Sequence, residues 1–344
     1  MYTVSIAAIK RKGHKLEIIN KIGPHWKHLD FQGLAIGDSQ KAGLQWSVFA
    51  PLNVARGTKR GTPGLKIMAT ALRITFDSNV WRPLVSPTVF PNDPDTGHFQ
   101  VIYRALQQKA ALGYLSDTVF TLEAIKRTFR KTFFGDYRGR VKMSTETVQK
   151  DVLHTSIVLG PDPSRSATNS PHLSKHWQDA LGLGFKLLRC TRIAGIGNSD
   201  LLDSYYAPDD RVLIDQRQVR MAQCSRDIET QGWGIKHIKD LGNKYANGGF
   251  WLDGIKNAPA SADGLIAKAV AEWADGDAVA VHFGYGNDYF CTRDTAKVGG
   301  PTSVLSASNR AWLSQKYHIQ FVTPEDLAKT LATSRSGNAS NTAS

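Results

Sequence analysis

Two aspartates directly follow apolar segments that alternate in the manner of β-strands. Asp77 ends ITFD and Asp294 ends DYFCTRD, so both side chains are expected at the carboxyl ends of strands. Open α/β sheets bind their ligands at that edge. Further acids are expected near the start of two helices, Glu123 in TLEAIKR and the pair Asp275 and Asp277 in WADGDAVAV. A parallel sheet could bring these carboxylates to one edge.

Carboxylates that share one site repel one another, and one of them would take up a proton unless a cation neutralised the group. The hard divalent ions Mg²⁺ and Mn²⁺ suit a site made only of oxygen ligands. Such ions lower the pKa of a bound water and stabilise the attacking and leaving oxygens of a phosphodiester displacement. Each acid taken alone could instead cap a helix or a turn. Four acids at equivalent topological positions favour metal-dependent hydrolysis of a nucleic-acid backbone.

The elements that would position these acids alternate between strand and helix. We expect a strand before Asp77, a helix in FQVIYRALQQKAALG that ends on Gly113, and then a short strand that runs into an amphipathic helix over residues 114–134. Residues 263–292 are expected to form a helix, a break, a second helix and a strand. The chain then continues with a helix in SNRAWLSQKY, a strand in IQFVT, and a helix opened by Thr323. This alternation indicates a parallel sheet with helices on both faces.

Composition shifts along the chain suggest its division. Residues 1–66 form a basic N-terminal region without an assigned fold, and residues 67–333 form the main α/β domain. Within that domain, residues 136–175 are rich in Gly, Pro, Ser and charge, which predicts a mobile insertion. Residues 334–344 are expected to be a disordered tail.

The charge balance points to polyanions as partners. The 344 residues include 43 Lys and Arg against 30 Asp and Glu, a formal net charge of +13. The excess lies in the N-terminal region, because residues 1–70 hold 11 basic and 3 acidic side chains, whereas residues 176–344 hold 18 of each. Solvated surface lysines would be the simpler explanation. A nucleic-acid-binding face in the N-terminal region is the functional interpretation.

Cysteine usage and hydropathy indicate a soluble protein of a reducing compartment. Cys190, Cys224 and Cys291 are an odd number of widely spaced residues, which favours neither a disulfide framework nor a zinc site. The apolar run at the start of the sequence is too short for the hydrophobic region of a signal peptide, and no apolar stretch approaches the length of a membrane span. We expect a cytoplasmic protein without membrane contact.

Three segments resemble the PIN domain family. ITFDSNVW resembles the opening strand of these domains, DYFCTRD resembles their fourth strand, and IQFVTPEDLAKTL resembles their final strand and helix. The resemblance covers roughly residues 70–332, with interruptions. It implies a three-layer α/β/α fold with a central parallel sheet, and a Mg²⁺- or Mn²⁺-dependent nuclease that acts on RNA. A protein inhibitor or a second copy of the chain is a further partner that the resemblance allows.

The resemblance also implies roles for individual residues. Asp77 corresponds to the first metal-binding acid of the family, Glu123 to the second and Asp294 to the last. Asn79 and Thr292 would support them. The segment that follows Glu123 is far longer than in a minimal PIN domain.

The third acid of the family has two candidates in this chain. Asp275 keeps an ungapped register with members that have a longer helix, whereas Asp277, followed by AVAV, matches the usual Asp-Ala opening of that helix. Residues two apart on a helix point in different directions, so both cannot face one site. The sequence leaves the choice between them open.

Two other classes of function were weighed. A non-catalytic nucleic-acid-binding or scaffold protein with a PIN-like fold would be expected to lack one of the carboxylates, and this chain has all four. A phosphatase or small-molecule hydrolase would need a deep apolar pocket. FDSNV resembles the nucleophile segment of haloacid dehalogenase-like phosphatases, but these have a second aspartate where this chain has Asn79. The sequence favours the nuclease.

Overall fold

The chain forms two compact units. The computed structural model describes residues 2–12, 15–18, 71–149, 152–190, 195–208, 211–294 and 302–339. The first unit combines the described residues up to 68 with residues 137–165 and 195–197, and the second unit takes the others. All the acids expected at the site belong to the second unit.

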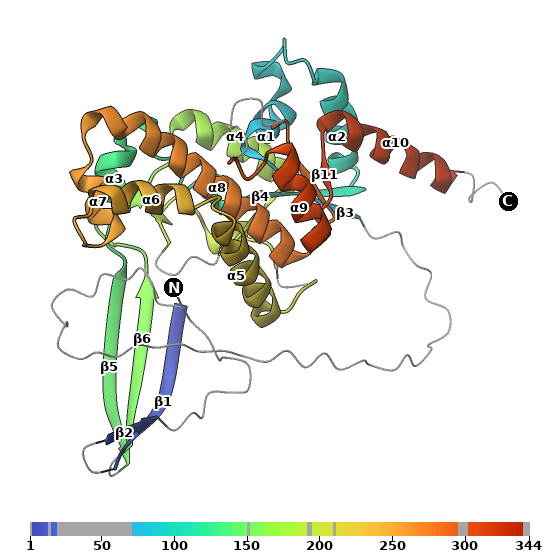
Figure 1. The fold of residues 1–344 in the computed structure, drawn as a ribbon. Coiled ribbons are helices and arrows are strands. Elements are labelled where there is room, and N and C mark those ends of the chain that lie inside the picture. The colour runs from blue at the N-terminus through green and yellow to red at the C-terminus, as the bar shows by residue number, and fades with distance from the viewer. Residues whose placement is uncertain are drawn as a thin grey trace, which may run out of the picture. The chain divides into compact units, whose positions relative to one another are not determined.

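The second unit is built on a five-stranded sheet in which all neighbouring strands are parallel. In order across the sheet, the strands are β11 (Phe321–Val322), β10 (Tyr289–Cys291), β3 (Leu72–Phe76), β4 (Ala111–Ser116) and β8 (Lys186–Leu188) (Figure 1). The expected parallel sheet is confirmed. The strands that precede Asp77 and Asp294 are neighbours, with Phe76 opposite Cys291.

Helices cover both faces of this sheet. Alternate residues of a strand point to opposite faces, so Cys291 packs in one core while Phe290 packs in another. The first core includes side chains of α1 (Ser78–Val85), α2 (Thr96–Gln107), α4 (Pro171–Gly182) and α10 (Pro324–Ala339). The opposite face packs against α5 (Ile214–Thr230), α8 (Asp263–Tyr285) and α9 (Ala307–Tyr317). This architecture is compatible with a three-layer α/β/α fold.

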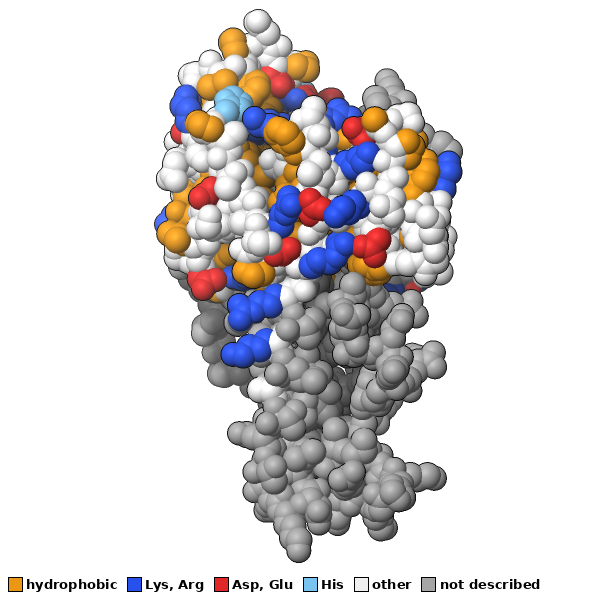
Figure 2. Space-filling model, turned by 90° about the vertical axis from the view of Figure 1, so that its left-hand side faces the viewer, with side chains coloured by type: hydrophobic (Ala, Val, Ile, Leu, Met, Phe, Trp, Pro, Cys, Tyr) orange, Lys and Arg blue, Asp and Glu red, His pale blue; other side chains and the backbone are white. Residues whose placement is uncertain are grey.

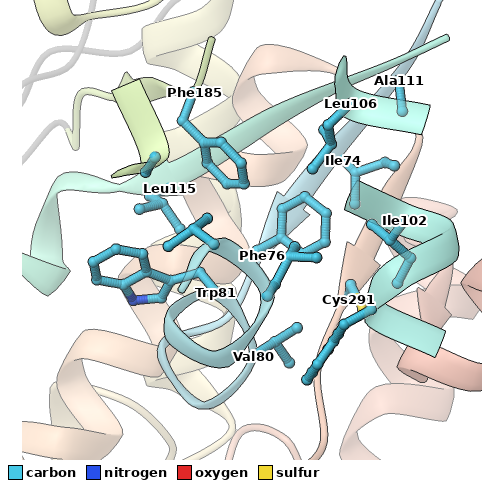
Figure 3. Packing of buried hydrophobic residues seen from close by; sticks show 14 of the residues in the cluster. Ile74, Phe76, Val80, Trp81, Ile102, Leu106, Ala111, Leu115, Phe185 and Cys291 are labelled. Atoms are coloured by element: carbon cyan, nitrogen blue, oxygen red, sulfur yellow. The ribbon is translucent and has the colours of Figure 1, made fainter. Parts of the chain in front are cut away.

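Gly113 lies in the middle of β4 and does not end a helix. Figure 3 shows Phe76 and Phe185 packed in the first core, with their ring centroids 5.5 Å apart. A Cβ atom at Gly113 would lie 2.6 Å from the ring of Phe185. The glycine is therefore needed for this close approach, and the expected helix ends earlier, at Gln107.

Within residues 114–134, the expected short strand is the end of β4 (Ala111–Ser116), but the amphipathic helix expected after it is not formed as one element. β4 is followed by the short helices η2 (Asp117–Val119) and η3 (Arg127–Phe129) and by α3 (Arg130–Asp136). Glu123 therefore lies in a turn, not at the start of a helix. Lys126 has an extended backbone (φ −53°, ψ 135°), and Arg130 Nε donates to the Ile125 carbonyl at 3.1 Å. A continuous helix would need that carbonyl for its own ladder.

Helix α8 runs for 23 residues without the expected break. Gly276, inside this helix, sits at a close contact: a Cβ atom there would lie 3.2 Å from the Cα of Gly234. The residue serves the packing of α8 against a neighbouring segment. Consequently Asp275 and Asp277 lie in the middle of one helix, not at the start of a second one.

The C-terminal elements agree with the sequence. Thr323 caps helix α10, since the backbone N–H of Asp326 donates to Thr323 Oγ1 at 3.1 Å and the Thr323 hydroxyl donates to Asp326 Oδ2 at 2.7 Å. The helix continues to Ala339, into residues expected to be a disordered tail. Residues 340–344 lie outside the described part of the chain.

The first unit contains an antiparallel four-stranded sheet in the order β2-β1-β6-β5. Its strands are β1 (Tyr2–Lys12), β2 (Lys15–Ile18), β5 (Arg140–Gln149) and β6 (Val152–Gly160). The segment expected to be a mobile insertion thus forms a strand pair, and β6 pairs with the N-terminal strand β1. The basic stretch ARGTKRG lies outside the described residues.

The remaining elements are short or connect the helical layers. They are η1 (Pro87–Val89), β7 (Ser166–Ala167), β9 (Gly197–Asn198), η4 (Asp203–Tyr205), α6 (Lys236–Tyr245), α7 (Trp251–Asn257) and η5 (Ala260–Ala262). Among the described residues, we find no helix with the length and apolarity that crossing a membrane requires.

Candidate active site

Asp77 is held where β3 ends and α1 begins. Its backbone N–H donates to the Cys291 carbonyl at 2.9 Å. As the N-cap of α1, its Oδ1 accepts the N–H of Ser78 at 2.6 Å, and its Oδ2 accepts the hydroxyl of Thr292 at 2.6 Å. Burial raises the pKa of the Asp77 carboxyl, hydrogen bonds from Thr292 and Ser78 act in the opposite direction, and the charge of Asp294 raises it further.

The end of β10 brings Asp294 next to this position. The N–H of Asp294 donates to Thr292 Oγ1 at 2.9 Å, so one hydroxyl connects the Asp294 backbone to the Asp77 carboxylate. Asn79 Oδ1 accepts the N–H of Arg293 at 3.2 Å. Thr292 and Asn79, both expected as supporting residues, therefore join the ends of the two neighbouring strands.

Glu123 reaches the same place from the turn after η2. Burial raises the pKa of its carboxyl to about 7, with the negative charge of Asp77 as the next cause. A hydrogen bond with the Ser78 side chain and the charges of Arg130 and Arg82 counter part of this effect. The residue is in the expected neighbourhood, although the local structure that carries it differs from the expected helix.

Asp275 completes the group from the middle of α8. Its pKa is raised well above the usual value, first by burial and then by the charges of Asp77, Glu123, Glu272 and Asp294. Four of the expected acids thus interact across elements that are far apart in the sequence. We call Asp77, Glu123, Asp275 and Asp294 the acidic cluster.

Asp277 does not belong to the acidic cluster. Its Oδ2 accepts the indole N–H of Trp273 at 2.8 Å, and it contributes to the electrostatic environment of Asp117, which follows β4. Residues two apart on a helix point about 200° apart around its axis, so the two α8 acids serve different places. Of the two candidates for the third acid, the structure brings Asp275 to the cluster.

Arg130 is a cation within reach of the acidic cluster that the sequence reasoning missed. Its side chain is buried and donates to the carbonyls of Ile125 at 3.1 Å and Ala267 at 2.5 Å. Burial lowers the pKa of its guanidinium, whereas the charges of Glu123 and Asp275 raise it. No motif marks this residue, because its role depends on α3 meeting α8.

Asp117 is the second missed residue. It follows β4 in YLSD as Asp77 follows β3 in ITFD, and this shared pattern could have drawn attention to it. Burial raises the pKa of its carboxyl to about 6, and hydrogen bonds from Cys190 and the charge of Arg189 act in the opposite direction. The carboxyl ends of β3 and β4 therefore each carry an aspartate, buried at Asp77 and half-buried at Asp117.

The donor set of the acidic cluster is suited to a hard cation, since all its side chains offer oxygen and they repel one another when ionised. Within the described ranges, however, no three or more His, Cys, Asp or Glu side chains are arranged so that they could hold a metal ion. The cluster therefore matches a Mg²⁺ or Mn²⁺ site in chemistry and electrostatics, while ligation by three of its acids would require the side chains to move closer together.

Comparisons of the chain with protein-family models, with curated proteins and with solved structures find no match.

Proposed function

We propose that this chain is a metal-dependent nuclease with a PIN-like fold that hydrolyses phosphodiester bonds of single-stranded RNA. The observation that carries the proposal is the acidic cluster, in which Asp77, Glu123, Asp275 and Asp294 interact at the carboxyl ends of neighbouring parallel strands. Carboxylates gathered in this way stay ionised together only when cations offset their charge.

The proposed reaction divides the work among the side chains. The four acids would hold Mg²⁺ or Mn²⁺, which activates water and offsets charge on the phosphate oxygens when bound. Thr292 and Ser78 fix both oxygens of Asp77 through hydrogen bonds of 2.6 Å. Because these donors come from the ends of β10 and α1, Asp77 is oriented by the fold before any substrate arrives.

Exposed side chains that could bind a single strand of nucleic acid lie in the segment after Glu123. Lys126 and Arg127 are exposed in the segment between Glu123 and the buried Arg130, and Phe129 in the same segment has a side chain that is 59% exposed. Basic side chains contact phosphates, and an exposed aromatic ring offers a face on which a base can stack. The expected contribution of the basic N-terminal region remains a further proposal.

Charge is not of one sign over the whole surface. On the face shown in Figure 2, basic and acidic side chains are intermixed. In the second unit, ion pairs such as Lys131 with Asp263 at 3.6 Å and Lys256 with Asp136 at 3.2 Å also place opposite charges next to each other. Binding of nucleic acid would therefore depend on local groups of cations and not on the net charge alone.

The test compares two aspartates at equivalent strand ends. In Asp77→Asn the fold should survive, because Asn keeps the volume, while cleavage of a labelled single-stranded RNA in Mn²⁺ or Mg²⁺ should fall by roughly a thousandfold. Asp117→Asn removes a carboxylate from the end of β4 and should leave cleavage within a few-fold of wild type.

Chelator should abolish cleavage by wild type and by Asp117→Asn alike, and thermal melting should verify that both variants are folded. Equal cleavage by wild type and Asp77→Asn would refute the proposed active site. Absence of cleavage by the wild type across varied RNA and DNA substrates would refute the nuclease proposal.

One observation favours a second candidate, a non-catalytic nucleic-acid-binding or scaffold protein with the same fold. Arg130 carries a buried positive charge that attracts Glu123 and Asp275, so part of the cluster is already neutralised by the chain itself. In that protein, RNA would bind without being cut, and Asp77→Asn would leave binding unchanged or tighter.

A further inference from the structure

Two histidines on α4 place their ring nitrogens side by side. His172 and His176 are one helical turn apart, and their Nε2 atoms are 3.0 Å apart. The start of the helix is fixed, because Ser170 caps it through the N–H of Leu173 at 3.2 Å. His172 is exposed and His176 is buried, so the nitrogen pair lies where the helix meets solvent.

The orientation of His176 is determined by a chain of hydrogen bonds. Ser86 Oγ lies 2.5 Å from Asp179 Oδ2 and 2.7 Å from His176 Nδ1. The carboxylate can only accept, so the single hydroxyl hydrogen of Ser86 is donated to Asp179. His176 Nδ1 must then donate its own hydrogen to Ser86, and His176 Nε2 is left with a lone pair directed toward His172.

The two rings do not face each other head-on. Their centroids are only 4.3 Å apart, although the Nε2 atoms are already separated by 3.0 Å, and the ring planes meet at 86°. Rings that pointed straight at each other would have centroids much further apart than their nitrogens. At least one of the two Nε2 atoms is therefore directed away from the line that joins the nitrogens, which is a poor geometry for an N–H···N bond.

We propose that His172 and His176 form a binding site for a divalent transition-metal ion, with zinc as the ion of first choice. Imidazole nitrogens suit zinc, which bonds them at about 2.0–2.1 Å, and two nitrogens on a tetrahedral ion are then about 3.3 Å apart. A small rotation of the exposed His172 ring supplies the difference from 3.0 Å. Water completes the coordination.

The chain from Asp179 through Ser86 to His176 is the type of outer support that histidine ligands of metals have. It fixes the tautomer of His176 that leaves Nε2 free for an ion. Arg82 and Lys175 act against a cation at this place and Asp179 acts in its favour, as their influence on the His176 charge indicates. The inference uses none of the residues of the acidic cluster and stands apart from the nuclease proposal.

An ion at this site would strengthen the connection between two helices. Ser86 is the C-cap of α1, and His176 belongs to α4, so fixing His176 also fixes the end of the helix that begins after Asp77. Metal binding to the folded state alone raises stability. Zinc should therefore raise the thermal midpoint of the protein.

The experiment titrates the full chain with zinc chloride in a calorimeter, in excess Mg²⁺ so that oxygen sites are occupied. Wild type should show one zinc site and a raised thermal midpoint. In His172→Ala, affinity should fall by at least about tenfold and the thermal shift should disappear. Because His172 is exposed, this variant should remain folded.

His318→Asn is the matched control, since it removes an exposed histidine outside the pair and Asn tolerates the left-handed backbone at that position (φ 57°). It should bind zinc as wild type does. Failure of wild type to bind zinc would overturn the proposal. Equal binding by wild type and His172→Ala would also overturn it, because the ion would then be adventitious.

Discussion

The ends of β3 and β4 are built alike and differ in how their carboxylates are satisfied. Each strand ends on a buried or half-buried aspartate, Asp77 or Asp117, and helix α8 supplies an acid to each, Asp275 or Asp277. We call Asp117 and Asp277 the β4 pair. Both aspartates have a raised pKa with burial as the largest cause.

The hydrogen-bond donors and the cation that interact with the β4 pair belong to the chain itself. Asp117 Oδ1 accepts the backbone N–H of Cys190 at 3.2 Å and is attracted by Arg189, whereas Asp277 accepts the indole N–H of Trp273 at 2.8 Å. The acidic cluster has twice as many carboxylates, and each of Glu123 and Asp275 is influenced chiefly by burial and by other acids.

A carboxylate at a strand end is therefore not by itself a sign of metal chemistry. What separates the two places is the supply of donors and cations from the chain. The charge of the β4 pair is offset by donors and cations of the chain itself. In the acidic cluster the chain offsets the negative charge only in part, through Arg130, so a bound cation would stabilise the cluster.

The largest difference between the two places is expected when the two α8 acids are replaced one at a time by asparagine. Asp275→Asn should reduce Mn²⁺-dependent cleavage of RNA by at least about a hundredfold, because it removes a charged oxygen ligand. Asp277→Asn keeps the volume and an acceptor oxygen for Trp273, so cleavage should change by less than a few-fold. The measurement is the initial rate of RNA cleavage by each variant. Equal losses in both would show that the cluster and the β4 pair act as one site.

A second measurement tests the repulsion within the acidic cluster. The folded protein raises the pKa of Glu123 from 4.5 to about 7, so its ionised form is disfavoured by folding, and stability should be lost as pH rises through this range. In chelator at pH 8, Glu123→Gln should therefore be more stable than wild type, by about 1–3 kcal/mol. Near pH 4.5 the difference should be small. Denaturant titrations at both pH values measure the free energy of unfolding of each protein. A difference between Glu123→Gln and wild type that is the same at both pH values would contradict the prediction.

The smallest expected effect concerns the exposed segment beside the cluster. Phe129→Ala removes a ring that is 59% exposed, and loss of base stacking should raise the KM for single-stranded RNA by roughly fivefold, for about 1 kcal/mol at the lower end of the stacking energy of a base, with kcat little changed. Leu265→Ala, at an equally exposed apolar side chain on α8, is the control. A fall in kcat without a change in KM would assign Phe129 a role other than substrate binding.

The sequence was informative where local pattern decides structure. Alternation in ITFD and in DYFC located β3 and β10, and the Thr323 cap located the start of α10, because strand faces and helix caps depend on neighbours in the chain. These elements were sufficient to expect the parallel sheet and the closeness of Asp77 to Asp294.

The rest depended on contacts between distant segments. The close contact of Gly276 in α8 with Gly234 is invisible in the sequence. The turn at Glu123 also depends on a distant contact, because the Arg130 side chain donates to the Ile125 and Ala267 carbonyls. Likewise, the pairing of β6 with β1 joins residues more than 140 positions apart. Propensity and periodicity report on a window of chain and carry no record of such partners.

The uninterrupted course of α8 has a consequence for how this chain can change in length. A residue inserted between Ile266 and Ala274 would rotate one end of the helix by about 100° relative to the other. Either the contact of Gly276 with Gly234 or the packing of the helix start would then be lost. Insertions into the flexible connections between such elements destabilise the fold much less, since doubling the length of a connection adds only about 0.6 kcal/mol of closure entropy. The long span between Glu123 and Asp275 could therefore expand during evolution while α8 kept its length.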